Sequence, residues 1–165
     1  MNTSRNKKVL YVTHAAIIAA IYVVLTIAGA SFSYGEVQVR ISEALTILPV
    51  FTPAAIPGLF IGCFLSNLLG QGIMLDVIAG SLTTLIAAYL TWLLRNKSRY
   101  LAVLPPIVLN ALIVPFILKY GYALPLPIPF MMLTVGAGEV ISCGILGLLL
   151  HKVISNYKYV LFPAR

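Results

Sequence analysis

Long hydrophobic runs separated by short polar stretches make up most of this chain of 165 residues. A helix of about 20 apolar residues crosses the ~30 Å hydrocarbon core of a bilayer, so runs of this kind predict membrane helices. Six segments are predicted on this basis, at residues 9–30, 43–56, 58–69, 76–94, 100–118 and 130–150.

The second and third of these segments are short, and Pro57 separates them within the run from Pro53 to Gly58. Proline removes a backbone donor and glycine permits a sharp turn, which favours a break at this point. A helix of about 14 residues covers only about 21 Å, so both segments are expected to sink into the bundle rather than face lipid along their whole length. The alternative is a single long span kinked at the prolines, which would invert the orientation of everything after it.

The distribution of basic residues separates these two topologies, because Lys and Arg are enriched in cytoplasmic loops. With six spans and a cytoplasmic N-terminus, only Arg40 and Lys119 lie outside, whereas five spans would put the cluster around Lys97 on the wrong side. Both termini of this multi-pass protein of the plasma membrane are therefore predicted to be cytoplasmic. The basic residues on that side are Arg5, Lys7, Lys8, Arg95, Lys97, Arg99, Lys152, Lys158 and Arg165.

The composition strengthens the assignment to the membrane. Hydrophobic residues make up 61% of the chain, charged residues only 9%, and the mean hydropathy is +1.02. Soluble domains have roughly 25% charged residues. We therefore predict an all-α membrane protein in which residues 1–165 form a single domain, a compact bundle of six transmembrane helices. The net charge of +7 marks this topology and does not indicate a nucleic-acid partner.

Acidic residues inside the predicted bundle are the strongest candidates for function. Glu139 lies about ten residues from the outer end of its segment, hence roughly 15 Å deep, where a carboxylate costs on the order of 3 kcal/mol. Its helix face also carries small residues, which allow a ligand or another helix to approach. We expect ligand contact, and the alternative is a structural carboxylate that is protonated or hydrogen-bonded to a neighbouring helix. All four acids lie in the outer half or near the midplane: Glu36, Glu43, Asp76 and Glu139.

Three further polar residues are candidates for ligand binding. Asn110 offers two donors and an acceptor at a depth similar to that of Glu139, and it could bind a ligand or join two helices. Asn67 lies toward the outer end of the third segment. Asp76 opens the fourth segment and could bind a ligand or be the N-cap of that helix.

Several kinds of chemistry find no support in the sequence. Cys63 and Cys143 have no CxxC spacing and no neighbouring His, so we interpret them as packing residues and predict no metal or redox site. No nucleophile and base can be placed together in the outer half, which argues against an enzyme. A purely structural membrane protein would gain little from such costly acids. No GxxxxGK[ST] motif occurs, so the chain holds no ATP of its own and no cofactor is predicted.

The first segment carries four small residues at helical spacing, which place methyl groups on one narrow face. Such a face lets another helix approach closely, and that helix could belong to this bundle or to a separate subunit. The residues are Ala15, Ala16, Ala19 and Ala20.

The polar segment QVRISEALTILP, from Gln38 to Pro49, resembles the queuosine-precursor transporter (QueT) family. These proteins are the substrate-binding S components of energy-coupling factor (ECF) transporters. The resemblance implies import powered by ATP in partner proteins, namely a transmembrane coupling subunit and two ABC ATPases. It also implies that the alanine stretch from Ala15 to Ala20 docks on the coupling subunit.

The ligand implied by the resemblance is a 7-deazaguanine, a queuosine precursor or queuine. A carboxylate can accept two hydrogen bonds from the adjacent N–H donors of a guanine-like edge, and an amide can complement its carbonyl and remaining amine. An S component for another vitamin, such as a flavin or thiamine, is the alternative. The candidate binding residues are Glu139, Glu43, Asn110, Asn67, Gln38, Arg40 and Asp76.

Overall fold

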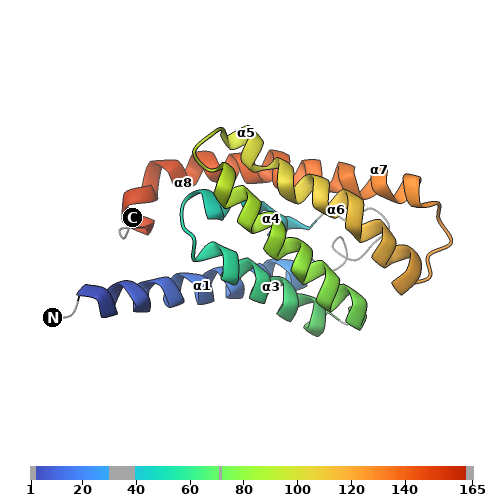
Figure 1. The fold of residues 1–165 in the computed structure, drawn as a ribbon, viewed down its shortest axis with the longest axis horizontal. Helices are drawn as coiled ribbons and strands as arrows, with labels where there is room; N and C mark the ends of the chain where they lie inside the picture. Colours follow the sequence, from blue (N-terminus) through green and yellow to red (C-terminus); the bar gives the residue numbers. More distant parts are fainter. Residues whose placement is uncertain (1–2, 30–39, 71, 163–165) are drawn as a thin grey trace.

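Helices form almost all of the computed structural model, which describes residues 3–29, 40–70 and 72–162 (Figure 1). No strand occurs within these ranges. The element η1 is a 3₁₀ helix, and η2, η3 and η4 are π-helical stretches that continue neighbouring α-helices. In chain order the elements are α1 (Thr3–Ala28), η1 (Ile41–Val50), α3 (Ala55–Leu69), η2 (Asp76–Gly80), α4 (Ser81–Leu94), α5 (Arg99–Ala102), α6 (Leu104–Phe116), η3 (Ile117–Gly121), α7 (Ile128–Glu139), η4 (Val140–Leu146) and α8 (Gly147–Leu161).

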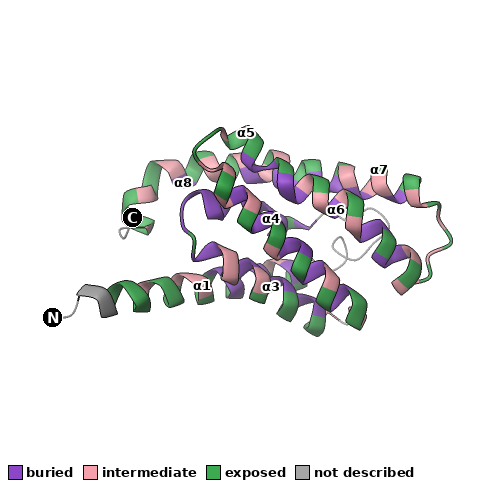
Figure 2. Cartoon of the chain, viewed as in Figure 1, coloured by how far each residue is buried: buried purple, intermediate pink, exposed green. Residues whose placement is uncertain are grey.

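Four of the helical segments are long and apolar enough to cross a membrane, and two shorter apolar helices complete the described bundle. Many large apolar residues are exposed, and Figure 2 shows exposed residues along the outward faces of the helices. Lipid rather than water suits such a surface, so the prediction of an all-α membrane protein is confirmed. The long segments are Asn6–Ala28, Asp76–Leu94, Arg99–Gly121 and Ile128–Leu161, and the short ones are Ile41–Val50 and Ala55–Leu69.

The last helix continues beyond the apolar segment predicted at residues 130–150, because it runs from Ile128 to Leu161 and has 34 residues. This length corresponds to about 51 Å, more than the ~30 Å hydrocarbon core, so the helix extends beyond the core. The apolar run ends before residue 151. Residues 151–161 are amphipathic and continue the helix beyond that run.

The break between the second and third segments was predicted at Pro57, but it lies at residues 51–54. The hydroxyl of Thr52 accepts a hydrogen bond of 3.3 Å from the backbone N–H of Ala54 and closes this turn. Pro57 lies in the first turn of α3, where its missing N–H leaves no hydrogen bond unmade. The chain reverses direction at the break (Figure 1), which excludes one long span kinked at the prolines.

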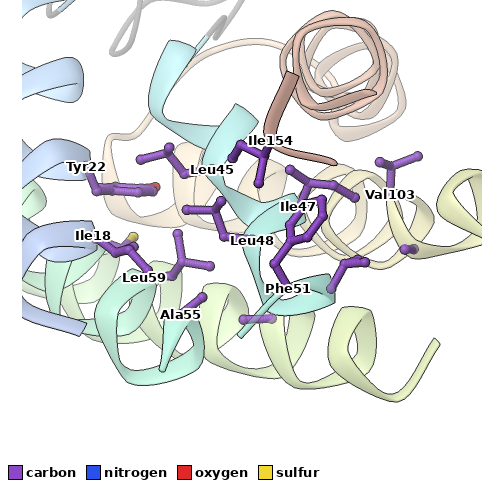
Figure 3. Packing of buried hydrophobic residues seen from close by; sticks show 14 residues of the cluster. Ile18, Tyr22, Leu45, Ile47, Leu48, Phe51, Ala55, Leu59, Val103 and Ile154 are labelled. Atoms are coloured by element: carbon purple, nitrogen blue, oxygen red, sulfur yellow. The ribbon is translucent and has the colours of Figure 1, made fainter. Parts of the chain in front are cut away.

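The short helix η1 is the centre of the bundle. Every residue of η1 after Ile41 is buried, and η1 packs against α1, α3, α4, α8 and η4. Figure 3 shows Leu45, Ile47 and Leu48 of η1 beside apolar side chains of the surrounding helices. Because protein covers η1 on all sides, it does not need the length of a membrane span. The expectation that this segment sinks into the bundle is confirmed, whereas α3 still exposes one apolar face.

Glycines of α3 permit close contact with α1. A Cβ atom at Gly58 would lie 2.7 Å from the carbonyl oxygen of Ala15, and one at Gly62 would lie 2.7 Å from the Cβ of Tyr22 and 3.1 Å from the carbonyl oxygen of Ala19. Neither position has room for a larger residue, so these glycines serve helix packing.

We predict that Gly62→Ala lowers the melting temperature of the purified protein by several degrees. Added volume in a packed interface costs about 1–3 kcal/mol, because the two helices must move apart. Gly136→Ala is the matched control, since a Cβ at Gly136 meets only the Cβ of Ala111, at an ordinary distance of 3.5 Å. Equal melting temperatures for the two variants would contradict this account of the α1–α3 contact.

Candidate ligand site

Buried polar side chains from η1, α6 and α7 meet inside the bundle. Glu43 of η1 is 2% exposed, Glu139 of α7 is 5% exposed and Asn110 of α6 is 6% exposed. Three residues that the sequence predicted separately therefore belong to one cluster. Burial of this kind is costly without partners, so the hydrogen bonds of each group matter.

Glu139 has partners for both of its carboxylate oxygens. Its Oε1 accepts a hydrogen bond of 3.0 Å from Nδ2 of Asn110, and its Oε2 accepts one of 3.0 Å from the thiol of Cys143. For both Asn110 and Glu139, the alternative to ligand binding was contact between helices. The hydrogen bond between these two residues is such a contact, because it joins α6 to α7. The thiol of Cys143 is thus part of the polar cluster and not only a packing group.

Glu43 is held from one side only. Its Oε1 accepts a hydrogen bond from the hydroxyl of Tyr22 of α1, and Tyr22 is fully buried. Its Oε2 has no hydrogen-bond partner. One side-chain ligand atom each of Glu43, Glu139 and Cys143 lie within 4.8 Å of one another. Two carboxylates at this spacing repel each other, which favours any group that donates hydrogen bonds or positive charge to both.

The same three side chains offer the kind of atoms that ligate metal ions. Their spacing in the sequence predicts no such set, because Glu43 comes from a different helix. Only the packing of η1 against η4 brings them together.

A second polar cluster contains Arg40, Asp76 and Tyr122. The Oδ2 of Asp76 lies 3.9 Å from Nη2 of Arg40 and accepts a hydrogen bond of 3.0 Å from the hydroxyl of Tyr122. Burial and the neighbouring Asp76 carboxylate raise the pKa of Tyr122 to about 12, so this phenol stays protonated and remains a donor at neutral pH.

The interpretation of Asp76 as an N-cap is wrong. Its helix already begins at Met74, and the side chain makes no capping hydrogen bond. The carboxylate instead turns toward Arg40 and Tyr122. Gly80 keeps room for it, because a Cβ at Gly80 would lie 2.8 Å from Oδ1 of Asp76.

Asn67 connects α3 to this second cluster. Its Nδ2 donates a hydrogen bond of 3.3 Å to the backbone carbonyl oxygen of Asp76, and the residue is fully buried. Its Oδ1 has no partner. Gln38 and Glu36, the other polar residues predicted near the site, lie outside the described residues.

Within the described part of the chain, three buried side-chain atoms have no hydrogen-bond partner: Oε2 of Glu43, Oδ1 of Asn67 and Oγ of Ser142. Unpaired buried polar atoms are rare in folded proteins and call for an explanation. Two of these three belong to predicted binding residues. Both are oxygen acceptors, so they suit a ligand that presents N–H donors.

Sequence reasoning missed several members of the site. Tyr22 and Ser142 lie in apolar helices with no distinguishing neighbours. Cys143 was interpreted as a packing residue, although its spacing of four residues from Glu139 was the signal for a hydrogen bond between them. Tyr122 follows a predicted span and gave no indication that it would contact Asp76.

Comparisons with known proteins agree with the resemblance seen in the sequence. The family model described as QueT transporter matches residues 12–156. A curated relative, Queuosine precursor transporter QueT of Lactococcus lactis subsp. cremoris (strain MG1363), is 38% identical over 95 residues. That alignment covers 56% of this chain and 56% of the relative, so the match spans little more than half of either protein. No solved structure matches the chain. Because the family model covers the chain from α1 to α8, this protein belongs to the QueT transporter family.

Proposed function

We propose that this protein is the substrate-binding S component of an ECF-type importer and captures a 7-deazaguanine, a queuosine precursor or queuine, from the extracellular side. Family membership and the name of the Lactococcus relative support the substrate class. The polar cluster in the bundle supports binding, since its groups are hydrogen-bond acceptors and donors that can complement a polar ligand.

The observation that carries the proposal is the buried pair Glu43 and Glu139 with an unpartnered oxygen on Glu43. A guanine-like edge presents a ring N–H beside an exocyclic amine, and a carboxylate accepts both in bidentate fashion. The ligand would thereby satisfy Oε2 of Glu43 and relieve the repulsion between the two carboxylates.

The remaining polar groups complement the rest of the base. The second N–H of Asn110 can donate to the ring carbonyl, and Oδ1 of Asn67 can accept from a further N–H. In this proposal Arg40 and Asp76 form the neighbouring charged pair, and Gln38 precedes Arg40 in the polar segment from Gln38 to Pro49.

The chain carries no P-loop and so has no ATP site of that kind. We propose that a coupling subunit with two ABC ATPases supplies the transport energy and docks on α1. Of the four alanines predicted to dock, Ala15 and Ala19 lie against α3, whereas Ala16 and Ala20 are exposed. The exposed pair is therefore the half of the alanine face that a separate subunit can reach.

Binding is tested by Glu139→Gln, which replaces one carboxylate oxygen with an amide NH₂ group. This NH₂ group is a donor and cannot accept a hydrogen bond from the N–H groups of the ligand. We expect the affinity of the purified protein for a 7-deazaguanine base, measured by calorimetry, to fall more than tenfold. A charged hydrogen bond lost in a dry site costs roughly 2–5 kcal/mol.

Asn156→Ala, at an exposed position of α8, is the control and should bind normally. Unchanged binding in both Glu139→Gln and Glu43→Gln would refute recognition by carboxylates. A parent protein that binds riboflavin or thiamine but no deazapurine would refute the substrate class.

Docking is tested by Ala16→Trp. We expect this variant to lose co-purification with the coupling subunit while the isolated protein binds its ligand with unchanged affinity, because the added ring blocks helix approach. Ala137→Trp places the same ring at an exposed position of α7 and should leave the complex intact. Full recovery of the complex with Ala16→Trp would show that docking occurs elsewhere.

Topology is tested by labelling single cysteines in cells with a membrane-impermeant reagent. The proposed orientation puts both termini and Lys97 in the cytoplasm, so Lys97→Cys should react only after permeabilisation. Tyr120→Cys, at the opposite end of the bundle and 72% exposed, should react in intact cells. The reverse pattern would show that the topology is inverted. The natural Cys63 and Cys143 are both buried.

A further inference from the structure

An apolar groove of about 720 Å³ runs between α1, η1 and α8. Its rim is formed by side chains that face the surroundings of the bundle, such as Ile17 at 50% and Leu149 at 58% exposure. Its floor includes Leu45 of η1, which lies between Tyr22 and Ile154 in Figure 3. The groove belongs to neither of the two polar clusters described above.

A second pocket, of about 400 Å³, adjoins this groove. The two cavities share His14 and Phe162, whose rings are in edge contact with centroids 5.4 Å apart. In contrast to the groove, the second pocket has polar lining residues, namely Thr52, Arg95 and Asn96. The apolar groove and the polar, basic pocket therefore adjoin at these two rings.

Arg95 contributes a guanidinium group to the lining of this pocket. Its guanidinium lies 4.2 Å from the centroid of the Trp92 ring, and Nη1 donates a hydrogen bond of 2.9 Å to the Trp92 carbonyl oxygen. A guanidinium has five N–H donors in a planar fork, so donors remain for a phosphate. Lys97 lies in the same turn and Arg99 begins α5, at the end of the bundle where both chain termini lie (Figure 1).

The groove is long enough for an extended acyl chain, because helix α1 lines it from His14 to Leu25, a rise of about 17 Å. The basic pocket beside it supplies the charge that complements a lipid phosphate.

We propose that this groove and pocket form a binding site for an anionic phospholipid, with an acyl chain in the groove and the phosphate at Arg95. The site lies on the outer surface of the bundle and is independent of the proposed ligand site. A bound lipid would fill a lateral gap between α1 and α8 that no side chain of the described residues occupies.

Native mass spectrometry of the detergent-purified protein tests the site, with phosphatidylglycerol and phosphatidylcholine of identical acyl chains as probes. We expect the protein to retain phosphatidylglycerol preferentially and Arg95→Gln to reduce this preference about tenfold, as loss of a charged hydrogen bond does. Lys97→Gln removes the same charge from an exposed position outside the pocket lining and should keep the preference.

A second pair of variants tests the groove. Ile17→Trp fills it and should reduce retention of both lipids, whereas Ile86→Trp, at an equally exposed position of α4, should not. Melting temperatures measured without added lipid report whether the variants fold.

Three results would overturn the proposal. The first is equal retention of the two lipids by the parent protein. The second is an equal loss in Arg95→Gln and Lys97→Gln, which would indicate diffuse surface charge. The third is full lipid retention by Ile17→Trp together with loss of the coupling subunit, which would assign the groove to a protein partner.

Discussion

The absence of water from the hydrocarbon core is the constraint on which this structure depends. Every polar group inside the bundle must find its partner in the protein or in a ligand. Glu139 meets this requirement through Asn110 and Cys143, and Asp76 meets it through Arg40 and Tyr122. The carboxylate of Glu43 meets it on one side only, through Tyr22. The unpaired acceptor Oε2 of Glu43 therefore characterises the candidate site as much as the hydrogen bonds within it.

A short, fully enclosed helix makes this arrangement possible. Because η1 does not face lipid, it can carry Glu43 into the middle of the bundle at a depth where a lipid-facing helix could not place a carboxylate. Its enclosure requires close packing around it, and the contact of Gly58 and Gly62 with α1 contributes to that packing. The turn at residues 51–54 then returns the chain into α3, which brings Asn67 toward Asp76.

The two faces of α1 have different roles in this picture. The face with Ala15, Ala19 and Tyr22 is used inside the bundle, where it contacts α3 and holds Glu43. The face with Ala16 and Ala20 remains exposed. Under the proposed function, α1 contributes to the ligand site with one face and presents small residues to the coupling subunit with the other. Any change in how α1 packs would alter both surfaces together.

Composition and hydrophobic pattern alone determined that this is a helical membrane protein with six apolar segments, because lipid allows few polar side chains on a helix surface. Rare polar residues marked Glu43, Asn67, Asp76, Asn110 and Glu139 as candidates for the same reason. Only the tertiary structure decided which of them meet, since Glu43 and Glu139 lie on helices far apart in sequence. The structure also places the helix break at residues 51–54 and not at Pro57. Proline is tolerated in the first turn of a helix, so its presence alone does not locate a break. The contacts of Tyr22, Cys143 and Tyr122 follow from how the helices pack, and no local sequence pattern encodes them.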